Sequence, residues 1–286
     1  MATQQTRVLA RVAVAPSVIM LFIWMIVPLV LTIYYSLNNF VLSDISNFYW
    51  NNFDNYRFFL TDPAFLKSLW VSLLIVGCVL LITVIGGILI ALLMDQPFAG
   101  QGIVRLMVLA PFFVMPTVAA LIWKNLFMNA DSGLLTWVSQ TLHLPVVVWF
   151  TNWPLLSIII IVAWQWLPFA ALILLTAIQS LDEEQKEASQ LDGAKPLSYF
   201  FYIVLPHLSR AITVVILIET IFLLNIFAEI KVTTNGSLDT ANLPFLVFQT
   251  QSEDIGMASA GAIVAVILAN IVAFFLVRMI GKNLEA

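Results

Sequence analysis

The chain has 286 residues, of which 62% are apolar and only 10% are charged. Its mean hydropathy of +1.00 and a charged fraction well below the about 25% of an ordinary soluble domain exclude a soluble globular protein and make lipid the expected solvent. The net charge of −4, without any cluster of Lys and Arg, argues against a surface for nucleic acid.

Six apolar runs are long enough to cross a membrane, because a hydrocarbon core about 30 Å thick requires about 20 residues of helix. The predicted spans are Val12–Leu37, Leu66–Met94, Ile103–Asn125, Leu155–Gln179, Leu208–Ile230 and Met257–Ile280. These runs are continuous and do not alternate with a period of two, so helices are expected and a β-barrel is not. The predicted fold class is all-α: a polytopic bundle of six transmembrane helices, forming one transmembrane domain over residues 1–286.

Three segments lie on the side opposite to the termini: 38–65, 127–154 and 232–256. They are too short for a further globular domain and are rich in Asn, Asp, Trp and Phe. Because aromatic residues favour membrane interfaces, we expect interfacial turns and lateral helices. These would also form a docking floor for an external protein.

The segment between the fourth and fifth spans, residues 181–206, is polar but has the pattern of two short helices. Asp182 can cap a helix with an acidic first turn, Gln185 can complete a capping box, and Gly193 stands where that helix is expected to stop. Pro196 suits the first turn of a second helix leading to the fifth span. A solvated linker is the alternative.

Basic residues near the span ends predict the orientation. With the N-terminus in the cytoplasm, eight of the 12 Lys and Arg residues lie on the inner side and four on the outer side. The inner set is Arg7, Arg11, Arg105, Lys186, Lys195, Arg210, Arg278 and Lys282. The outer set is Arg57, Lys67, Lys124 and Lys231. Because basic residues favour the cytoplasmic side, both termini are expected in the cytoplasm.

The sequence lacks the motifs of an enzyme site. It has no phosphate-binding loop of the form G-x-x-x-x-G-K-[S/T], no H-E-x-x-H and no Cys/His cluster, and His143 and His207 are far apart. We therefore expect no catalytic residue, no cofactor and no metal site in this chain. His207, at the inner end of the fifth span, is expected to hydrogen-bond backbone or water.

The polar exceptions that stand out in the fourth and fifth predicted spans are Gln165, Glu219, Asn225 and Glu229. An ionisable group at membrane depth costs at least about 2–3 kcal/mol unless it faces protein or water, so these residues are functional candidates. Glu219 is expected either to line a polar cavity or to make a structural hydrogen bond to another helix. Glu229 is expected at the interface or against a partner.

Trp164, Gln165 and Trp166 form an aromatic and amide cluster at mid-span. Aromatic faces stack on the C–H surfaces of sugars and polyols while amides satisfy hydroxyls, so this composition suits a neutral, hydroxyl-rich solute. Ordinary packing of helices is the alternative. With Glu219 and Asn225, these three residues make up the predicted solute pathway.

Prolines interrupt the third and fourth predicted spans: Pro111 and Pro116 lie in the third and Pro168 in the fourth. Each frees a backbone carbonyl that lipid cannot satisfy. Kinked helices around a water-accessible path would accommodate them. The Gly86–Gly87 pair in the second span permits close contact with another helix.

The loop between the fourth and fifth spans also contains a longer pattern. Glu187-Ala188-Ser189 is followed after three residues by Gly193 and after nine more by Ile203-Val204-Leu205-Pro206. This resembles the E-A-A-x3-G-x9-I-x-L-P signature of permease subunits in binding-protein-dependent ABC importers, with Ser189 in place of the second alanine. The resemblance covers essentially the whole chain and implies the type I importer permease fold, without the additional spans and large external insert of the largest maltose-type members.

In that family the loop forms coupling helices that dock into a groove on a cytoplasmic ATPase subunit. The resemblance implies that Glu187 makes a polar contact with the ATPase, that Ala188 and Ser189 allow close approach, and that Gly193 makes the turn. The coupling residues implied are Glu187, Ala188, Ser189, Asp192, Gly193, Ala194, Ile203, Leu205 and Pro206. The implied partners, in a bacterial inner membrane, are a second permease in a heterodimer, two ATPase subunits that use ATP and Mg, and an external solute-binding protein.

Other stretches resemble the carbohydrate-uptake group of these permeases: Met94–Phe98, Ala110–Thr117, Trp164–Phe169 and Phe227–Ile230. They are most similar to permeases for sugar alcohols such as mannitol and sorbitol. The resemblance implies ATP-driven import of a small neutral carbohydrate or polyol by alternating access. The alternatives are an importer of this architecture for a glycoside, polyamine or phosphate ester, an ion-coupled secondary transporter, which would have a symmetric pair of broken helices, and a membrane receptor or scaffold.

Overall fold

The computed structural model describes the backbone of residues 4–284 and the side chains of residues 12–275 and 278. Contacts within the chain define two compact units, Met1–Phe65 with Val247–Ile267 and Leu66–Leu246 with Leu268–Ala286. The side chains of Arg7, Arg11 and Lys282, which contributed to the predicted orientation, lie outside the described residues. The prediction of one transmembrane domain stays a prediction.

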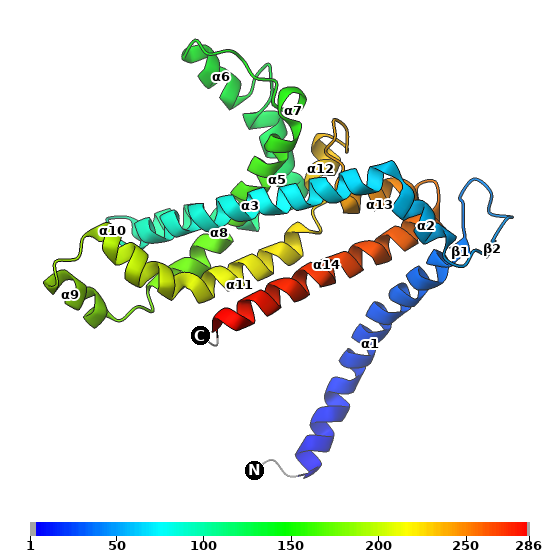
Figure 1. The fold of residues 1–286 in the computed structure, drawn as a ribbon, viewed down its shortest axis with the longest axis horizontal. Helices are drawn as coiled ribbons and strands as arrows, with labels where there is room; N and C mark the ends of the chain where they lie inside the picture. Colours follow the sequence, from blue (N-terminus) through cyan, green and yellow to red (C-terminus); the bar gives the residue numbers. More distant parts are fainter. Residues whose placement is uncertain (1–3, 285–286) are drawn as a thin grey trace. The chain divides into compact units, whose positions relative to one another are not determined.

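Helices make up nearly all of the regular structure. The helices are α1 (Gln4–Ser36), α2 (Asp54–Thr61), α3 (Pro63–Asp95), α4 (Gln101–Leu109), η1 (Ala110–Phe113), α5 (Pro116–Ile122), η2 (Trp123–Phe127), α6 (Leu134–Thr141), α7 (Trp149–Asn152), α8 (Pro154–Ile178), α9 (Glu183–Leu191), α10 (Pro196–Tyr199), η3 (Phe200–Val204), α11 (Leu205–Leu223), α12 (Ala228–Thr233), α13 (Leu243–Gln251) and α14 (Ile255–Leu284). Two-residue strands β1 (Asn38–Asn39) and β2 (Tyr49–Trp50) pair antiparallel. The predicted all-α class is confirmed (Figure 1).

Five helical segments of the described chain are long and apolar enough to cross a membrane, and a bent pair makes a sixth. The five are Val12–Ser36, Pro63–Asp95, Pro154–Ile178, Pro196–Leu223 and Ile255–Phe275. The bent pair consists of Gln101–Phe113 and Pro116–Phe127, which are inclined to each other by 106°. The predicted bundle of six apolar helices is therefore present, with one span broken.

The break in the third span is sharper than the kink predicted within Ile103–Asn125. The chain tightens into the 3-10 turn η1, is extended at Val114, and starts a new helix with Pro116 at its first turn. Pro116 has no backbone N–H and disfavours helical backbone in the residue before it. The proline pair therefore produces a sharp break, where the sequence predicted a kink.

The fifth span ends earlier than predicted. Its helix α11 stops at Leu223, and a non-helical stretch separates it from the short helix α12, so the predicted continuous run to Ile230 is wrong. Freed carbonyls at this second break still find donors: Asn225 Nδ2 donates to Ile221 O at 2.7 Å, and Asn242 Nδ2 donates to Ile226 O. These amide donors replace the helical bonds that the break removes.

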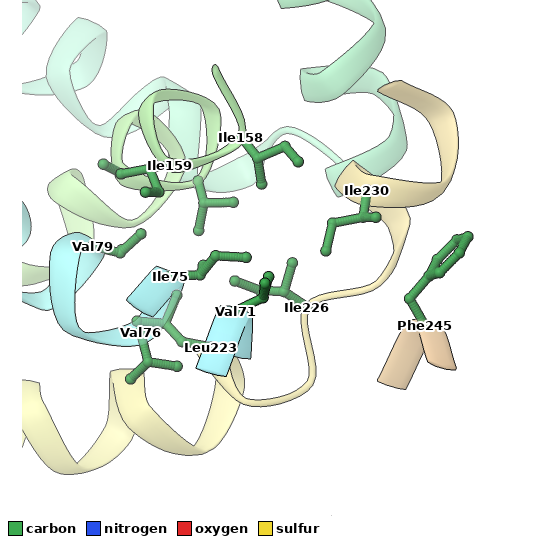
Figure 2. Packing of buried hydrophobic residues seen from close by; sticks show 12 residues of the cluster. Val71, Ile75, Val76, Val79, Ile158, Ile159, Leu223, Ile226, Ile230 and Phe245 are labelled. Atoms are coloured by element: carbon green, nitrogen blue, oxygen red, sulfur yellow. The ribbon is translucent and has the colours of Figure 1, made fainter. Parts of the chain in front are cut away.

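The core of the unit Leu66–Leu246 lies between α3, α8 and α11. Figure 2 shows one buried cluster, with Ile75 and Val79 of α3 facing Ile158 and Ile159 of α8 and Leu223 of α11. A second cluster lies nearer the other end of these helices. Its members from α3, α8 and α11 include Ile88, Ala91, Ala170, Leu174, Leu208 and Val215.

Close contact between α3 and α8 depends on glycine, as the sequence predicts. A Cβ placed on Gly87 would lie 2.9 Å from the Cβ of Ala170 and 3.2 Å from backbone atoms of α8, and one on Gly86 would lie 2.8 Å from a methyl of Leu167. Small residues let helix backbones approach in lipid, where attraction comes from close packing.

The unit Met1–Phe65 with Val247–Ile267 contains a small hydrogen-bond network at the end of α1. Asn55 Nδ2 donates to Ser36 O at 2.9 Å and to Asn38 O at 2.8 Å, and Ser36 Oγ lies 2.8 Å from the hydroxyl of Tyr56. These bonds satisfy carbonyls at a helix C-terminus that have no partner within the helix. The segment 38–65 therefore forms an ordered turn with a short lateral helix.

Candidate functional site

The loop at residues 181–206 folds as two short helices, so the linker alternative is wrong. Helix α9 begins at Glu183 directly after Asp182, as predicted, but the Asp182 carboxylate makes no capping hydrogen bond. Only a backbone bond from Gln185 N to Asp182 O, of 3.1 Å, closes the first turn. The predicted capping box is therefore not formed.

The C-terminus of α9 is closed by a glycine turn. Gly193 has φ of +71°, a conformation that only glycine adopts without strain. Gly193 N donates to Gln190 O at 3.1 Å and Ala194 N donates to Ser189 O at 3.0 Å. This pair of bonds is the Schellman arrangement that satisfies the last carbonyls of a helix, so the predicted turn at Gly193 is confirmed.

The second helix of the loop runs directly into the membrane. Pro196 occupies the first turn of α10, as predicted, and α10, η3 and α11 form one continuous apolar segment from Pro196 to Leu223. His207 Nε2 lies 3.0 Å from Ala177 O and 3.1 Å from Ser180 Oγ. The histidine thus ties the start of α11 to the end of α8 through backbone and hydroxyl contacts.

The side chains of the loop divide into an outward and an inward set. Glu187, Ala188 and Asp192 are exposed, whereas Ser189 is buried and its hydroxyl donates to Lys186 O at 2.7 Å. The other residues of the family pattern lie at the glycine turn or near the start of α11; they are Gly193, Ala194, Ile203, Leu205 and Pro206.

Three large side chains of this loop were missed from the sequence. Leu191 is 89% exposed, Leu197 72% and Tyr202 81%. Leu191 and Leu197 flank the glycine turn, whereas Tyr202 lies in η3. Apolar side chains this exposed at a polar loop indicate a contact surface for another molecule. For Leu191 and Leu197, closeness to Gly193 in the sequence is the signal that could have identified them.

Glu219 is fully buried at membrane depth, in contact with α3. One oxygen, Oε2, lies 2.6 Å from the Oγ1 of Thr83, while Oε1 has no hydrogen-bond partner among the described residues. The neighbouring Thr220 Oγ1 is also buried and unpartnered in this part of the chain. Of the two roles considered for Glu219, the geometry provides the interhelical hydrogen bond, and it leaves one carboxyl oxygen free for a further partner.

Gln165 lies at the break in the third span. Its Nε2 donates to Val114 O at 2.8 Å, and its Oε1 is buried without a partner among the described residues. The carbonyl of Val114 is one of those that the proline break frees. Gln165 therefore holds the break against α8 with its donor and keeps its acceptor available.

The two residues that flank Gln165 in sequence pack against aromatic rings. Trp164 packs edge-to-face on Trp123 with ring centroids 5.8 Å apart, and the Trp123 Nε1 is buried without a partner in the described part of the chain. Trp166 packs against Phe112 and Phe222. Trp123 was missed because it ends an apolar run and shows no pattern of its own.

Two other polar residues lie at or beyond the break in the fifth span. Asn225 follows the end of α11 and donates to Ile221 O in its last turn, as described above. Glu229 is only 4% exposed and lies in α12, which packs against α5, so within this chain its side chain is buried; its predicted place at the interface or against a partner stays a prediction. Lys124, just beyond α5, closes the far end of α12 by donating to Val232 O and Thr233 O at 2.9 Å each.

Within the described residues there is no group of three or more His, Cys, Asp and Glu side chains that could hold a metal ion. The fold and the site together define a polytopic helical permease. It has apolar spans, buried polar atoms in those spans without a partner among the described residues, and a helical loop with exposed apolar side chains. Residues 63–286 match the model of the family described as binding-protein-dependent transport system inner membrane component. The chain belongs to this family and is therefore a membrane permease subunit of an ABC transporter and not an enzyme.

Similar proteins agree with this assignment. The sulfoquinovosyl glycerol transport system permease protein SmoG of Agrobacterium fabrum is 30% identical, over 96% of this chain and 91% of its own length. The trehalose transport system permease protein SugA of Mycobacterium tuberculosis is 26% identical, over 96% and 89%. A chain in the crystal structure of a bacterial alginate ABC transporter, in complex with an alginate pentasaccharide-bound periplasmic protein, superposes with a TM-score of 0.79 over 95% of this chain and 93% of that chain. At 20% sequence identity, this last likeness shows the fold.

Proposed function

We propose that this chain is a permease subunit of an ATP-driven importer that moves a small, hydroxyl-rich carbohydrate or polyol across a bacterial inner membrane. The solute class is supported by SmoG and SugA, which belong to transport systems for sulfoquinovosyl glycerol and for trehalose. The match to a binding-protein-dependent family supports an external solute-binding protein as the donor of solute. The mechanism depends on one observation: the loop of α9 and α10 is helical and carries exposed apolar side chains.

The loop is proposed to bind a cytoplasmic ATPase. Exposed Glu187 offers a charged contact and Ala188 a small one, while Leu191, Leu197 and Tyr202 supply apolar area that would be buried on docking. Because α10 continues into α11 without a break, movement of the docked loop is transmitted directly to the fifth span. ATP binding and hydrolysis in the partner would then alternate the access of a central path.

Polar atoms without partners mark where that path contacts solute. Gln165 Oε1, Glu219 Oε1 and Trp123 Nε1 are buried acceptors and a donor that no described residue satisfies. A hydroxyl can both donate and accept, so a polyhydroxylated solute matches this mixture. We assign Trp164 and Trp166 to walls that stack on the solute, and Asn225 to the break in the fifth span.

The identity of the solute has two candidates. The resemblance of four sequence stretches to sugar-alcohol permeases favours a polyol such as mannitol or sorbitol. Similarity to SmoG, a permease of a sulfoquinovosyl glycerol transport system, favours a glycoside instead. Both candidates are rich in hydroxyls. Uptake of a panel of polyols and glycosides, measured in the presence of the partner solute-binding protein, distinguishes them.

The assembly is proposed to contain a second, similar permease, two ATPase subunits and the solute-binding protein, with both termini of this chain in the cytoplasm. In α1, no residue of the most apolar stretch is buried within the chain. A second permease would offer this helix a protein neighbour. ATP and Mg would be used by the ATPase subunits, with no cofactor in this chain.

The test is a bulky substitution at the glycine turn. Gly193→Trp is expected to abolish ATP-driven uptake and binding of the ATPase while the protein still inserts, because the indole projects from an open position at the loop tip, where no atom lies within 4 Å of an added Cβ. Gly100→Trp is the matched control, since Gly100 also has positive φ and open space but lies outside the loop. Normal uptake and normal ATPase binding in Gly193→Trp would refute the proposed coupling.

A further inference from the structure

A cavity lies at the root of α9, away from the exposed tip of the loop. Its volume is about 460 Å³, within the range of about 300–1,000 Å³ typical of small-ligand sites. Four segments wall it: the C-terminal ends of α3 and α8, the first turn of α9, and the α10–η3 segment. Figure 1 shows α9 and α10 at the end of α3, α8 and α11 where this cavity lies.

The charged groups around the cavity have no partners of their own. Asp95, Asp182 and Glu183 contribute three carboxylates and Lys186 one ammonium, a formal sum of −2. None of the four makes a side-chain hydrogen bond or ion pair with the described residues. In particular, the missing capping bond leaves the Asp182 carboxylate free.

Helix ends add to the negative potential. Asp95 is the last residue of α3, and Ile178 is the last residue of α8, so both helices direct the negative ends of their dipoles at this region. A carboxylate at such an end is unfavourable unless a cation is near. Arg105 Nη2 offsets part of this by donating to Met94 O at 3.0 Å, and the positive end of α9 offsets another part.

The remaining wall is apolar. Leu92, Ile178, Leu181 and Val204 line the cavity between the charged groups, with the ring of Tyr199 beside them. Metal coordination does not fit, because within the described residues no three carboxylate, imidazole or thiolate groups are close enough to hold an ion. A cation whose charges are separated by methylene groups matches both kinds of wall, since ammonium groups pair with carboxylates and the chain lies on apolar side chains.

We propose that this cavity binds an aliphatic polyamine from the cytoplasm, joining the root of α9 to the ends of α3 and α8. A polyamine bound here would link α9 to α3 and α8 and so restrain the loop that the proposed function assigns to ATPase coupling. The restraint would slow the ATP hydrolysis that accompanies solute transport. The inference rests on that proposed function only for the effect on rate. Binding itself is independent of it.

Spermidine is the probe, and the assembled permease–ATPase complex in lipid nanodiscs is the sample. We expect saturable binding that Asp95→Asn weakens about tenfold, through loss of one charge-assisted contact. Lys186→Gln removes the single cation of the wall and should tighten binding severalfold. Glu184→Gln, on the same turn of α9 but outside the cavity wall, should leave the affinity within about twofold. Misfolding cannot produce opposite shifts in Asp95→Asn and Lys186→Gln.

Several results would overturn the inference. The wild-type complex could show no saturable spermidine binding, or all three variants could bind spermidine equally. Mg²⁺ could displace spermidine at matched ionic strength. Spermidine could also bind only when the ATPase is absent, which would mean that an ATPase side chain fills the cavity. Unchanged ATP hydrolysis at saturating spermidine would refute the restraint, and spermidine accumulation in proteoliposomes would make it cargo. Failure of carbohydrate uptake would refute the proposed function and leave spermidine binding unaffected.

Discussion

Helices α1 and α8 are alike in sequence character but differ in surroundings. Their spans, Val12–Ser36 and Pro154–Ile178, have 25 residues each and hydropathies of 2.5 and 2.4. In the most apolar stretch of α8, 61% of residues are buried within the chain, and in that of α1 none is. Hydropathy thus identifies a helix that belongs in a membrane and does not distinguish lipid from protein as its neighbour.

Side-chain size explains part of the difference. Helix α8 carries Ala163, Ala170 and Ala171 among its buried residues, which allow other backbones to approach. Helix α1 instead exposes large side chains such as Trp24 and Met20. Substitutions in the two helices should therefore have unequal effects on the isolated chain. One experiment compares the two helices directly, and two others test the contacts that α8 makes.

The largest effect is expected where α3 meets α8. Gly87→Leu would force a side chain into the backbone of α8, a contact that rotamer changes cannot relieve, and should cost about 3 kcal/mol or prevent assembly. Gly77→Leu is the control, because on the same helix no atom lies within 4 Å of an added Cβ at Gly77. Thermal unfolding of the purified protein, followed by size-exclusion fluorescence, measures both. Equal stability of the two variants would contradict the packing of α3 on α8.

A substitution that leaves a cavity beside α8 is expected to have the next largest effect on stability. Ile161 is fully buried, and Ile161→Ala should destabilise by about 2 kcal/mol through lost packing. Ile19 of α1 is 56% exposed, so Ile19→Ala should change the stability of the isolated chain by less than about 0.5 kcal/mol. If Ile19→Ala instead weakens only the complex with a second permease, α1 is shown to be covered by that partner. A large loss of stability in the isolated chain would contradict the difference in burial between α1 and α8.

The smallest expected effect on stability comes from removing the side-chain amide of Gln165 in α8. Gln165→Met keeps the length of the side chain but removes the donor to Val114 O, which should destabilise the break in the third span by about 1 kcal/mol. Gln179→Met, at an exposed position just after α8, is the control. Hydrogen exchange of the amides around Val114 should rise only in Gln165→Met. Unchanged protection there would show that the bond does not hold the break.

Much of the loop was predictable from sequence because its signals are local. Gly193 has no side chain to clash at positive φ, and Pro196 fits a first helical turn, so each predicts a helix boundary without tertiary information. Asp182 shows the limit of such reasoning. It stands at the expected cap, yet its carboxylate makes no capping bond, because the orientation of one side chain depends on neighbours that a local pattern does not specify.

The membrane-depth candidates were predicted by residue type and not by role. Gln165, Glu219 and Asn225 stand out because polar groups are rare in apolar runs, but their partners lie far away in sequence or on the preceding turn. Thr83 and Val114 could not be named beforehand, since nothing in the sequence pairs them with Glu219 and Gln165. The break after Leu223 was likewise missed, because apolar residues continue through it.

Sequence alone determined that this chain is a helical membrane protein with a helical loop of the importer type, since apolar length, glycine and proline act through local energies. Tertiary structure decided which spans are buried, where two of them break, and which polar atoms are left without partners. These depend on contacts between residues far apart in the chain, where close packing and the satisfaction of freed carbonyls select one arrangement among many that hydropathy alone allows.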